Sequence, residues 1–151
     1  MNDLQLALKL YRSYNKRKEM CRLLIIDDNP IEHLILQRMI DSGKLFQDVS
    51  HSSDARLQIE SLRENCRFND KLPDLIFLDL HMPDFNGWEF LKHFKELIPL
   101  FNKTVDVYIV SSSIDPRDFS RSKNYPFVKS FVSKPFSKQN LSDTYLRYSA
   151  A

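Results

Sequence analysis

The stretch RLLIIDDNP, residues 22–30, leads from a short apolar run through two adjacent carboxylates into Asn-Pro. Apolar runs of this length that are rich in branched residues are typical of buried strands. Asn29 can cap a helix and Pro30 suits the first helical turn, so a helix is expected directly after the strand. A strand, a polar turn and a helix in this order form the first half of a βαβ unit.

Three further apolar runs, residues 75–78, 105–110 and 131–133, also end in a polar side chain. With the first run they place five polar residues at the carboxyl ends of expected strands: Asp27, Asp28, Asp79, Ser111 and Lys134. In an open parallel sheet, ligands bind in the crevice outside these ends. Three acids, one hydroxyl and one ammonium that converge there could bind a hard cation and a phosphoryl group together.

Helical patterns separate the apolar runs, and this alternation favours an α/β domain with a parallel sheet. A weaker strand is expected near residues 46–51 and a fifth strand at residues 127–132. The buried side of the first helix is expected to consist of four apolar residues: Ile31, Leu34, Ile35 and Leu36. Gly43 suits the position just past the end of that helix.

The composition narrows the function classes. The length of 151 residues fits a single domain. The net charge of only +2 gives little reason to expect nucleic-acid binding. No apolar stretch is long enough to span a membrane. Cys21 and Cys66 lie far apart and are expected to be unpaired thiols in a reducing compartment, so a cytoplasmic protein is expected.

Residues 1–20 form an extension that precedes the expected domain, residues 21–151. In the extension, apolar residues recur at helical spacing: Leu4, Leu8 and Tyr11. A basic run at residues 16–18 follows them. Two interpretations stay open: a frayed extension with a basic linker, or an extra helix that docks on the domain or on a partner.

Four motifs occur in order along the chain: IIDDNP at residues 25–30, LDLHMPDFNG at 78–87, VSS at 110–112 and SKPF at 133–136. Together they resemble the receiver domain of two-component response regulators, from about Arg22 to Arg147. The resemblance implies a flavodoxin-like (βα)5 three-layer sandwich with a five-stranded parallel sheet of order 2-1-3-4-5. It also implies a phosphorelay signalling protein of the stand-alone, chemotaxis type and a bacterial source.

The same resemblance implies that Asp79 is the phosphoacceptor and forms an acyl phosphate. It implies Mg²⁺ or Mn²⁺ held by the carboxylates of Asp28 and Asp79 and by the backbone carbonyl of His81. Asp27 would hold a metal-bound water. In the loop after the phosphoacceptor, Gly87 is expected to adopt a backbone angle that other residues resist.

Further roles follow from the resemblance. Ser111 and Lys134 would contact phosphoryl oxygens, and the Lys-Pro bond that follows is expected to be cis. Phe131 stands where relatives carry an aromatic residue that moves on phosphorylation. The alternative is that Phe131 is an ordinary buried residue of the core. His81 and Ser112 would tune the lifetime of the acyl phosphate, with solvated loop residues as the alternative.

The expected function is therefore a phosphorylation-operated switch rather than an enzyme. A histidine kinase or a phosphotransfer protein would donate the phosphoryl group. Few residues follow the last apolar run, so no attached output domain is expected, and the chain would act as a monomer or weak dimer through a protein contact. The expected output face combines the last two helices and the fifth strand, with Tyr125, Phe127 and Lys129 on it.

Three alternatives are open at this stage. An interaction module with the same fold could work without phosphorylation, although all five polar residues are present. A nucleotide or flavin binder would need a Gly- or Ser/Thr-rich turn after the first strand, where Asp27 and Asp28 would instead repel phosphate. A phosphohydrolase of the haloacid type would need a second Asp where His81 stands.

Overall fold

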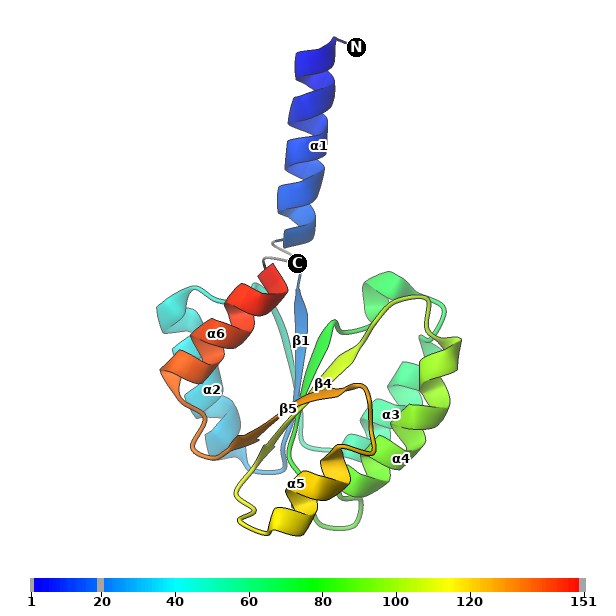
Figure 1. Cartoon of the computed structure of the whole chain (residues 1–151), viewed down its shortest axis with the longest axis vertical. Helices are drawn as coiled ribbons and strands as arrows, with labels where there is room; N and C mark the ends of the chain where they lie inside the picture. The colour runs from blue at the N-terminus through cyan, green and yellow to red at the C-terminus, as the bar shows by residue number, and fades with distance from the viewer. Residues whose placement is uncertain (1, 19–20, 150–151) are drawn as a thin grey trace.

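Five parallel strands form a sheet at the centre of the computed structural model, which describes residues 2–18 and 21–149 (Figure 1). The strands are β1 (Arg22–Ile26), β2 (Asp48–Ser52), β3 (Leu75–Leu78), β4 (Asp106–Ser111) and β5 (Val128–Ser133). Their order across the sheet is β2-β1-β3-β4-β5. The predicted fold and strand order are thus confirmed, with strand ends displaced by one or two residues.

Helices cover both faces of the sheet (Figure 1). Helices α2 (Pro30–Gly43) and α6 (Lys138–Ser149) lie on one face, and α3 (Ala55–Glu64) and α4 (Gly87–Leu97) lie on the other. Helix α5 (Pro116–Ser122) packs beside β5, and two short 3-10 helices cover Asn69–Lys71 and Ile98–Leu100. This arrangement gives the three layers of a doubly wound domain.

Strand β1 shows how the sheet divides the core in two. Leu24 and Ile26 belong to the apolar cluster under α3 and α4, whereas Leu23 and Ile25 belong to the cluster under α2 and α6. All four side chains are buried, because a parallel sheet is covered on both faces. On this central strand, polar residues therefore follow only where the strand ends, at the carboxyl edge of the sheet.

Helix α2 begins as predicted but buries a different side. The Asn29 side chain accepts a hydrogen bond from the Ile31 amide at 3.0 Å, and Pro30 is the first helical residue. Of the four apolar residues expected inside, only Leu36 is buried, together with Ile40. The other three are exposed: Ile31 by 63%, Leu34 by 51% and Ile35 by 46%. At 3.6 residues per turn, Ile31 and Leu34 lie nearly opposite Leu36, and Ile35 lies about a quarter of a turn from it.

The end of α2 also differs from the prediction. Gly43 is the last helical residue, and Lys44 takes the left-handed conformation with φ 52°. The Lys44 amide donates to the carbonyl of Asp41 at 3.2 Å, and the Leu45 amide donates to the carbonyl of Ile40 at 3.0 Å. These two bonds satisfy carbonyl groups at the end of the helix. Lys44 thus occupies the left-handed position after the helix that glycine usually occupies.

The N-terminal extension contains a helix, α1 (Asp3–Lys18) (Figure 1), and its docking on a partner stays a prediction. Residues 2–12 are all exposed, including Leu4, Leu8 and Tyr11. The apolar stripe on these residues is therefore not docked on the domain. Among the described residues, no helix combines the length and apolar character needed to cross a membrane.

Candidate functional site

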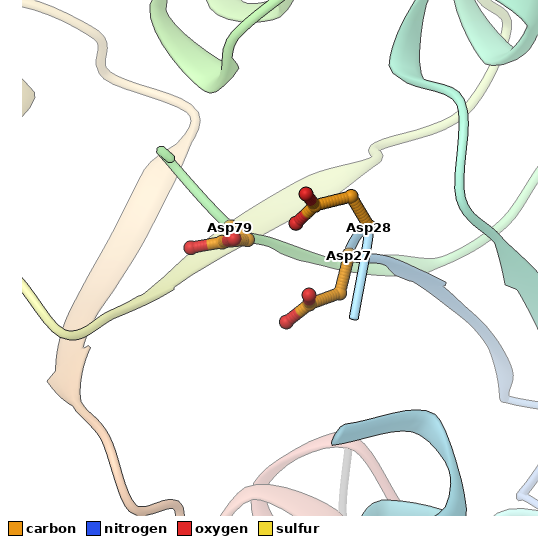
Figure 2. A group of neighbouring side chains, drawn as sticks. All are labelled: Asp27, Asp28 and Asp79. Atoms are coloured by element: carbon orange, nitrogen blue, oxygen red, sulfur yellow. The ribbon is translucent and has the colours of Figure 1, made fainter. Parts of the chain in front are cut away.

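Three carboxylates gather at the carboxyl edge of the sheet. Asp27 and Asp28 follow β1, and Asp79 follows the neighbouring strand β3, whose Leu78 pairs with Ile26. One ligand oxygen from each acid lies within 4.8 Å of the others. Figure 2 shows the three side chains with their carboxyl groups pointing to the same side. Asp27 and Asp79 are buried, whereas Asp28 is exposed.

Lys134 supplies a positive charge to this group of acids. Its Nζ lies 2.7 Å from Asp27 Oδ2 and 3.7 Å from Asp79 Oδ1. The peptide bond to Pro135 is cis, as predicted, and the Lys134 amide donates to the Ser111 carbonyl at 2.9 Å. Burial works to lower the pKa of Lys134, but the bond to Asp27 and the charge of Asp79 raise it above its ordinary value.

Asp79 is held in a setting that disfavours its own charge. Burial is the main cause that raises the pKa of Asp79 above its ordinary value, and the charge of Asp27 adds to it. The Lys134 ammonium acts in the opposite direction without cancelling the effect. The metal-free site therefore holds more negative charge than its single ammonium compensates.

The donor set fits Mg²⁺ or Mn²⁺. Both ions prefer carboxylate, carbonyl and water oxygens. Octahedral ligands about 2.0–2.1 Å from Mg²⁺ lie about 2.9–4.2 Å from one another, so acids with oxygens already within 4.8 Å need little movement. Asp28 is exposed and the cleft is open, so an ion held by these acids would be accessible to water and to a phosphoryl group.

An open cleft of about 710 Å³ gives access to this edge of the sheet. It is lined by Asp27, Asp28, Asn29, Glu32, Asp79, His81, Ser112, Lys134 and Pro135. His81 and Ser112 are exposed at this cleft, and the His81 amide lies 3.4 Å from Asp79 Oδ1 as a donor. Glu32 is a lining residue that the sequence analysis missed, because a Glu in a first helical turn is ordinary.

Ser111 lies beside the cleft rather than in its lining. Its side chain is completely buried, and its hydroxyl oxygen accepts a hydrogen bond from the Ser113 amide at 3.1 Å. Ser113 in turn bonds to Asp118 and accepts from the Asp115 amide at 3.2 Å, which organises the start of α5. The expected phosphoryl contact of Ser111 thus requires its hydroxyl to turn toward the cleft.

Gly87 is needed for a reason other than the one predicted. No described glycine has a positive φ, and in this loop the left-handed residue is Asp84, with φ 64°. A Cβ on Gly87 would lie 2.5 Å from the Asp79 carbonyl oxygen and 2.8 Å from the Leu80 Cα. Close packing of α4 against the end of β3, rather than a special backbone angle, therefore excludes a side chain.

Aromatic residues connect the surroundings of the site to α5. Phe131 on β5 is partly buried and packs edge-to-face against the exposed Phe119 of α5, with the ring centroids 5.9 Å apart. Tyr125 and Phe127, expected on the output face, are half-buried and pack against the core cluster with part of their surface exposed, and Lys129 is exposed. Tyr125 stacks on Trp88, near the start of α4, with the ring centroids 6.3 Å apart.

The sequence and structure comparisons agree with this geometry. A family model for the response regulator receiver domain matches residues 23–145. The chain therefore belongs to the response regulator receiver domain family, whose members are signalling phosphoacceptors of two-component systems.

Individual relatives extend this result. Two-component response regulator ORR1 of Oryza sativa subsp. japonica is 27% identical over 124 residues, which cover 80% of this chain and 52% of the relative. The chain thus spans about half the length of that curated relative. A two-component response regulator from Cytophaga hutchinsonii aligns with a TM-score of 0.76 and 26% identity, over 88% of this chain and 99% of that one.

A response regulator from Legionella pneumophila shows the same fold at 16% identity, with a TM-score of 0.73 over 86% of this chain and 98% of that one. The similar proteins come from a plant and from bacteria, so the expected bacterial source stays a prediction.

Proposed function

We propose that Asp79 accepts a phosphoryl group from the phosphohistidine of a histidine kinase or phosphotransfer protein, and that Mg²⁺ or Mn²⁺ is required. One observation carries the proposal: three carboxylates and one ammonium meet in a single open cleft. The acids have oxygens within 4.8 Å of one another, and Lys134 lies 3.7 Å from Asp79. Membership of the receiver family supports it.

In the proposed reaction, an Asp79 carboxylate oxygen attacks phosphorus opposite the donor imidazole. The new O–P bond forms as the N–P bond breaks, and the imidazole nitrogen keeps the electron pair. A bound Mg²⁺, held by Asp28, Asp79 and the His81 carbonyl, with Asp27 holding a metal-bound water, would neutralise part of the phosphoryl charge. Lys134 pairs with one phosphoryl oxygen, since its ammonium already lies beside Asp79.

The switch begins at Ser111. When its hydroxyl turns from the Ser113 amide toward a phosphoryl oxygen, Ser111 releases Ser113, whose own bonds to Asp115 and Asp118 organise the start of α5. Phe131 pairs with Ile109 across β4 and β5 and contacts Phe119, so repacking of Phe131 carries the change to α5. The output is a protein contact at the face formed by α5, β5 and α6.

His81 and Ser112 set the lifetime of the acyl phosphate. Both line the cleft and are exposed, so either can hold or screen a water that approaches phosphorus. The protein is then a phosphoacceptor that catalyses only its own phosphorylation and dephosphorylation. Residues 21–151 form the receiver domain and residues 1–20 an extension, in a cytoplasmic protein that works as a monomer or weak dimer.

The test is phosphorylation by acetyl phosphate with and without Mg²⁺. The parent should gain one phosphoryl group only when Mg²⁺ is present. Asp79→Ala should gain none, whereas Asp143→Ala, which removes an exposed acid on α6, should behave as the parent. Equal labelling of the Asp79→Ala protein would contradict the assignment. A parent that cannot be labelled would favour the phosphorylation-independent interaction module.

A further inference from the structure

We propose that His33 and His51 are positioning residues that fix the peptide group between Asp27 and Asp28. His33 Nε2 lies 2.7 Å from the Asp27 carbonyl oxygen, and His33 Nδ1 lies 2.7 Å from His51 Nδ1. The two rings meet edge-to-face, with centroids 4.9 Å apart. The relation of this pair to metal binding rests on the proposed function, but its effect on the peptide does not.

The hydrogen bonds of the pair form a chain with an acceptor at each end. A carbonyl oxygen only accepts, so His33 Nε2 donates to Asp27. At the far end, His51 Nε2 lies 2.7 Å from Gln37 Oε1, which also only accepts, because the Gln37 amide nitrogen donates to Asp41 at 2.8 Å. Both Nε2 atoms therefore act as donors, and a hydrogen bond between the two Nδ1 atoms needs one further proton, so this bond forms when one of the two rings is an imidazolium.

The pair joins three elements around the edge of the sheet. His33 lies in the first turns of α2, directly after the two acids, and His51 lies on the edge strand β2 opposite Ile25 of β1. Gln37 lies one turn beyond His33 on α2, so His51 contacts α2 at two successive turns, through His33 and through Gln37. The pair therefore ties α2 and β2 together where β1 ends.

The hydrogen bond from His33 to the Asp27 carbonyl adds to three other bonds that hold Asp27 in place. Its amide donates to the Ser52 carbonyl at 3.1 Å, Oδ1 accepts from the Asn29 amide at 2.8 Å, and Oδ2 accepts from Lys134 at 2.7 Å. The carbonyl belongs to the peptide that leads to Asp28, the exposed acid. Rotation of that peptide would change the direction of Asp28 relative to Asp27. His33 holds the peptide, and His51 holds His33.

The direct test is nuclear magnetic resonance on the metal-free, unphosphorylated protein. The backbone nitrogen of Asp28 is bonded to the Asp27 carbonyl carbon, so its chemical shift reports whether that carbonyl accepts a hydrogen bond. His33→Ala should move the shift, and His33→Gln, whose amide can still donate, should restore most of it. His93→Ala, on α4, removes a ring that stacks on Phe85 and has no hydrogen bond to Asp27 or His51, so it should leave the shift close to its parental value.

The second readout is the dissociation constant for Mg²⁺, measured by calorimetry. His33→Ala should raise it about tenfold, as for other residues that orient metal ligands, and His33→Gln should recover most of the loss. His51→Ala, which retains His33, should give a smaller rise. Urea unfolding of each variant separates this effect from a general loss of stability, because His93→Ala and His33→Gln serve as folded references.

The outcomes are distinct. An Asp28 nitrogen shift and a Mg²⁺ affinity that stay at parental values in both His33→Ala and His51→Ala would overturn the proposal, as would His33→Gln failing as completely as His33→Ala. If the parent proves unable to bind Mg²⁺ or accept a phosphoryl group, the proposed function fails. The Asp28 shift in the metal-free variants still decides whether the histidine pair holds the peptide.

Discussion

Asp79, the proposed phosphoacceptor, is held in a setting that disfavours its ionised form. Its carboxylate is 5% exposed and lies beside Asp27, so burial and a like charge both oppose ionisation. If Asp79 is the nucleophile proposed above, its burial leaves the attacking oxygen poorly solvated. The proposed function would then cost stability at this position, and this cost can be measured.

Asp79→Asn should raise the free energy of unfolding of the metal-free protein at neutral pH by more than about 0.5 kcal/mol. Because the pKa of Asp79 is raised in the folded state, its ionisation disfavours folding once the pH exceeds the unfolded-state value. The advantage of the variant should therefore shrink as the pH falls toward the ordinary Asp value of about 3.9. Urea titrations at several pH values provide the measurement.

Two controls accompany this comparison. Asp143→Asn removes an exposed acid on α6 and should not change stability at any pH. Excess Mg²⁺ should reduce the difference between the parent and Asp79→Asn, because the ion stabilises only the form with three acids. A variant less stable than the parent at neutral pH would show that burial of Asp79 carries no penalty.

Lys134→Met should destabilise the metal-free protein by about 3 kcal/mol, because it leaves the buried Asp27 carboxylate without its partner at 2.7 Å. The double variant Lys134→Met/Asp27→Asn removes both charges and should recover most of that loss. Thermal or urea unfolding of both proteins checks the prediction. Equal losses in the single and double variants would mean that Lys134 stabilises the fold by packing alone.

At the scale of elements, the turn from β3 into α4 depends on the absence of a side chain at Gly87. Gly87→Ala should cost about 1 to 3 kcal/mol, because the new Cβ would lie 2.5 Å from the Asp79 carbonyl oxygen. Gly43→Ala is the matched control. Its Cβ would meet only the flexible side chain of Leu45, at 3.0 Å, so its effect should stay below about 1 kcal/mol.

Denaturation midpoints of the two alanine variants measure this difference. The Gly87→Ala protein should also accept a phosphoryl group more slowly, because a displaced Asp79 carbonyl moves the phosphoacceptor itself. Similar midpoints for the two variants would contradict the close packing described for this turn.

Sequence patterns predicted the elements well and the buried side of α2 badly. Caps such as Asn29-Pro30 are local, so the start of the helix could be found from neighbouring residues alone. The helix, however, carries apolar residues on two sides, and periodicity cannot decide between them. Only the position of the sheet selects Leu36 over Leu34 and leaves the second side exposed.

The candidate site was predicted to the extent that its residues directly follow strands. Asp27 and Asp79 lie close together because each follows a parallel strand and parallel strands end at the same edge of the sheet. The alternation of apolar runs and helical segments in the sequence is sufficient to predict this proximity. The pairing of His33 with His51 could not be predicted, because it depends on the register of β2 against β1. The inward position of Ser111 depends on the loop that Ser113 organises.

At the scale of the whole molecule, phosphorylation can act only through its different interaction with two states of the domain. Ser111→Ala removes the hydroxyl proposed to connect the site to Phe131 and α5. The variant should still accept a phosphoryl group, though more slowly. Beryllium trifluoride, a phosphoryl mimic, should change amide exchange in residues 115–132 of the parent, and much less in Ser111→Ala. Equal responses would show that the signal leaves the site by another route.

The central claim is that the edge of the sheet where three acids meet accepts a phosphoryl group on Asp79. The most direct measurement is to phosphorylate the intact chain with acetyl phosphate and Mg²⁺, trap the acyl phosphate by borohydride reduction, and locate the modified residue by peptide mass mapping. We expect one modified aspartate, Asp79, and no trapped acyl phosphate when Mg²⁺ is removed. Modification at Asp27, at Asp28 or outside the cleft would contradict it.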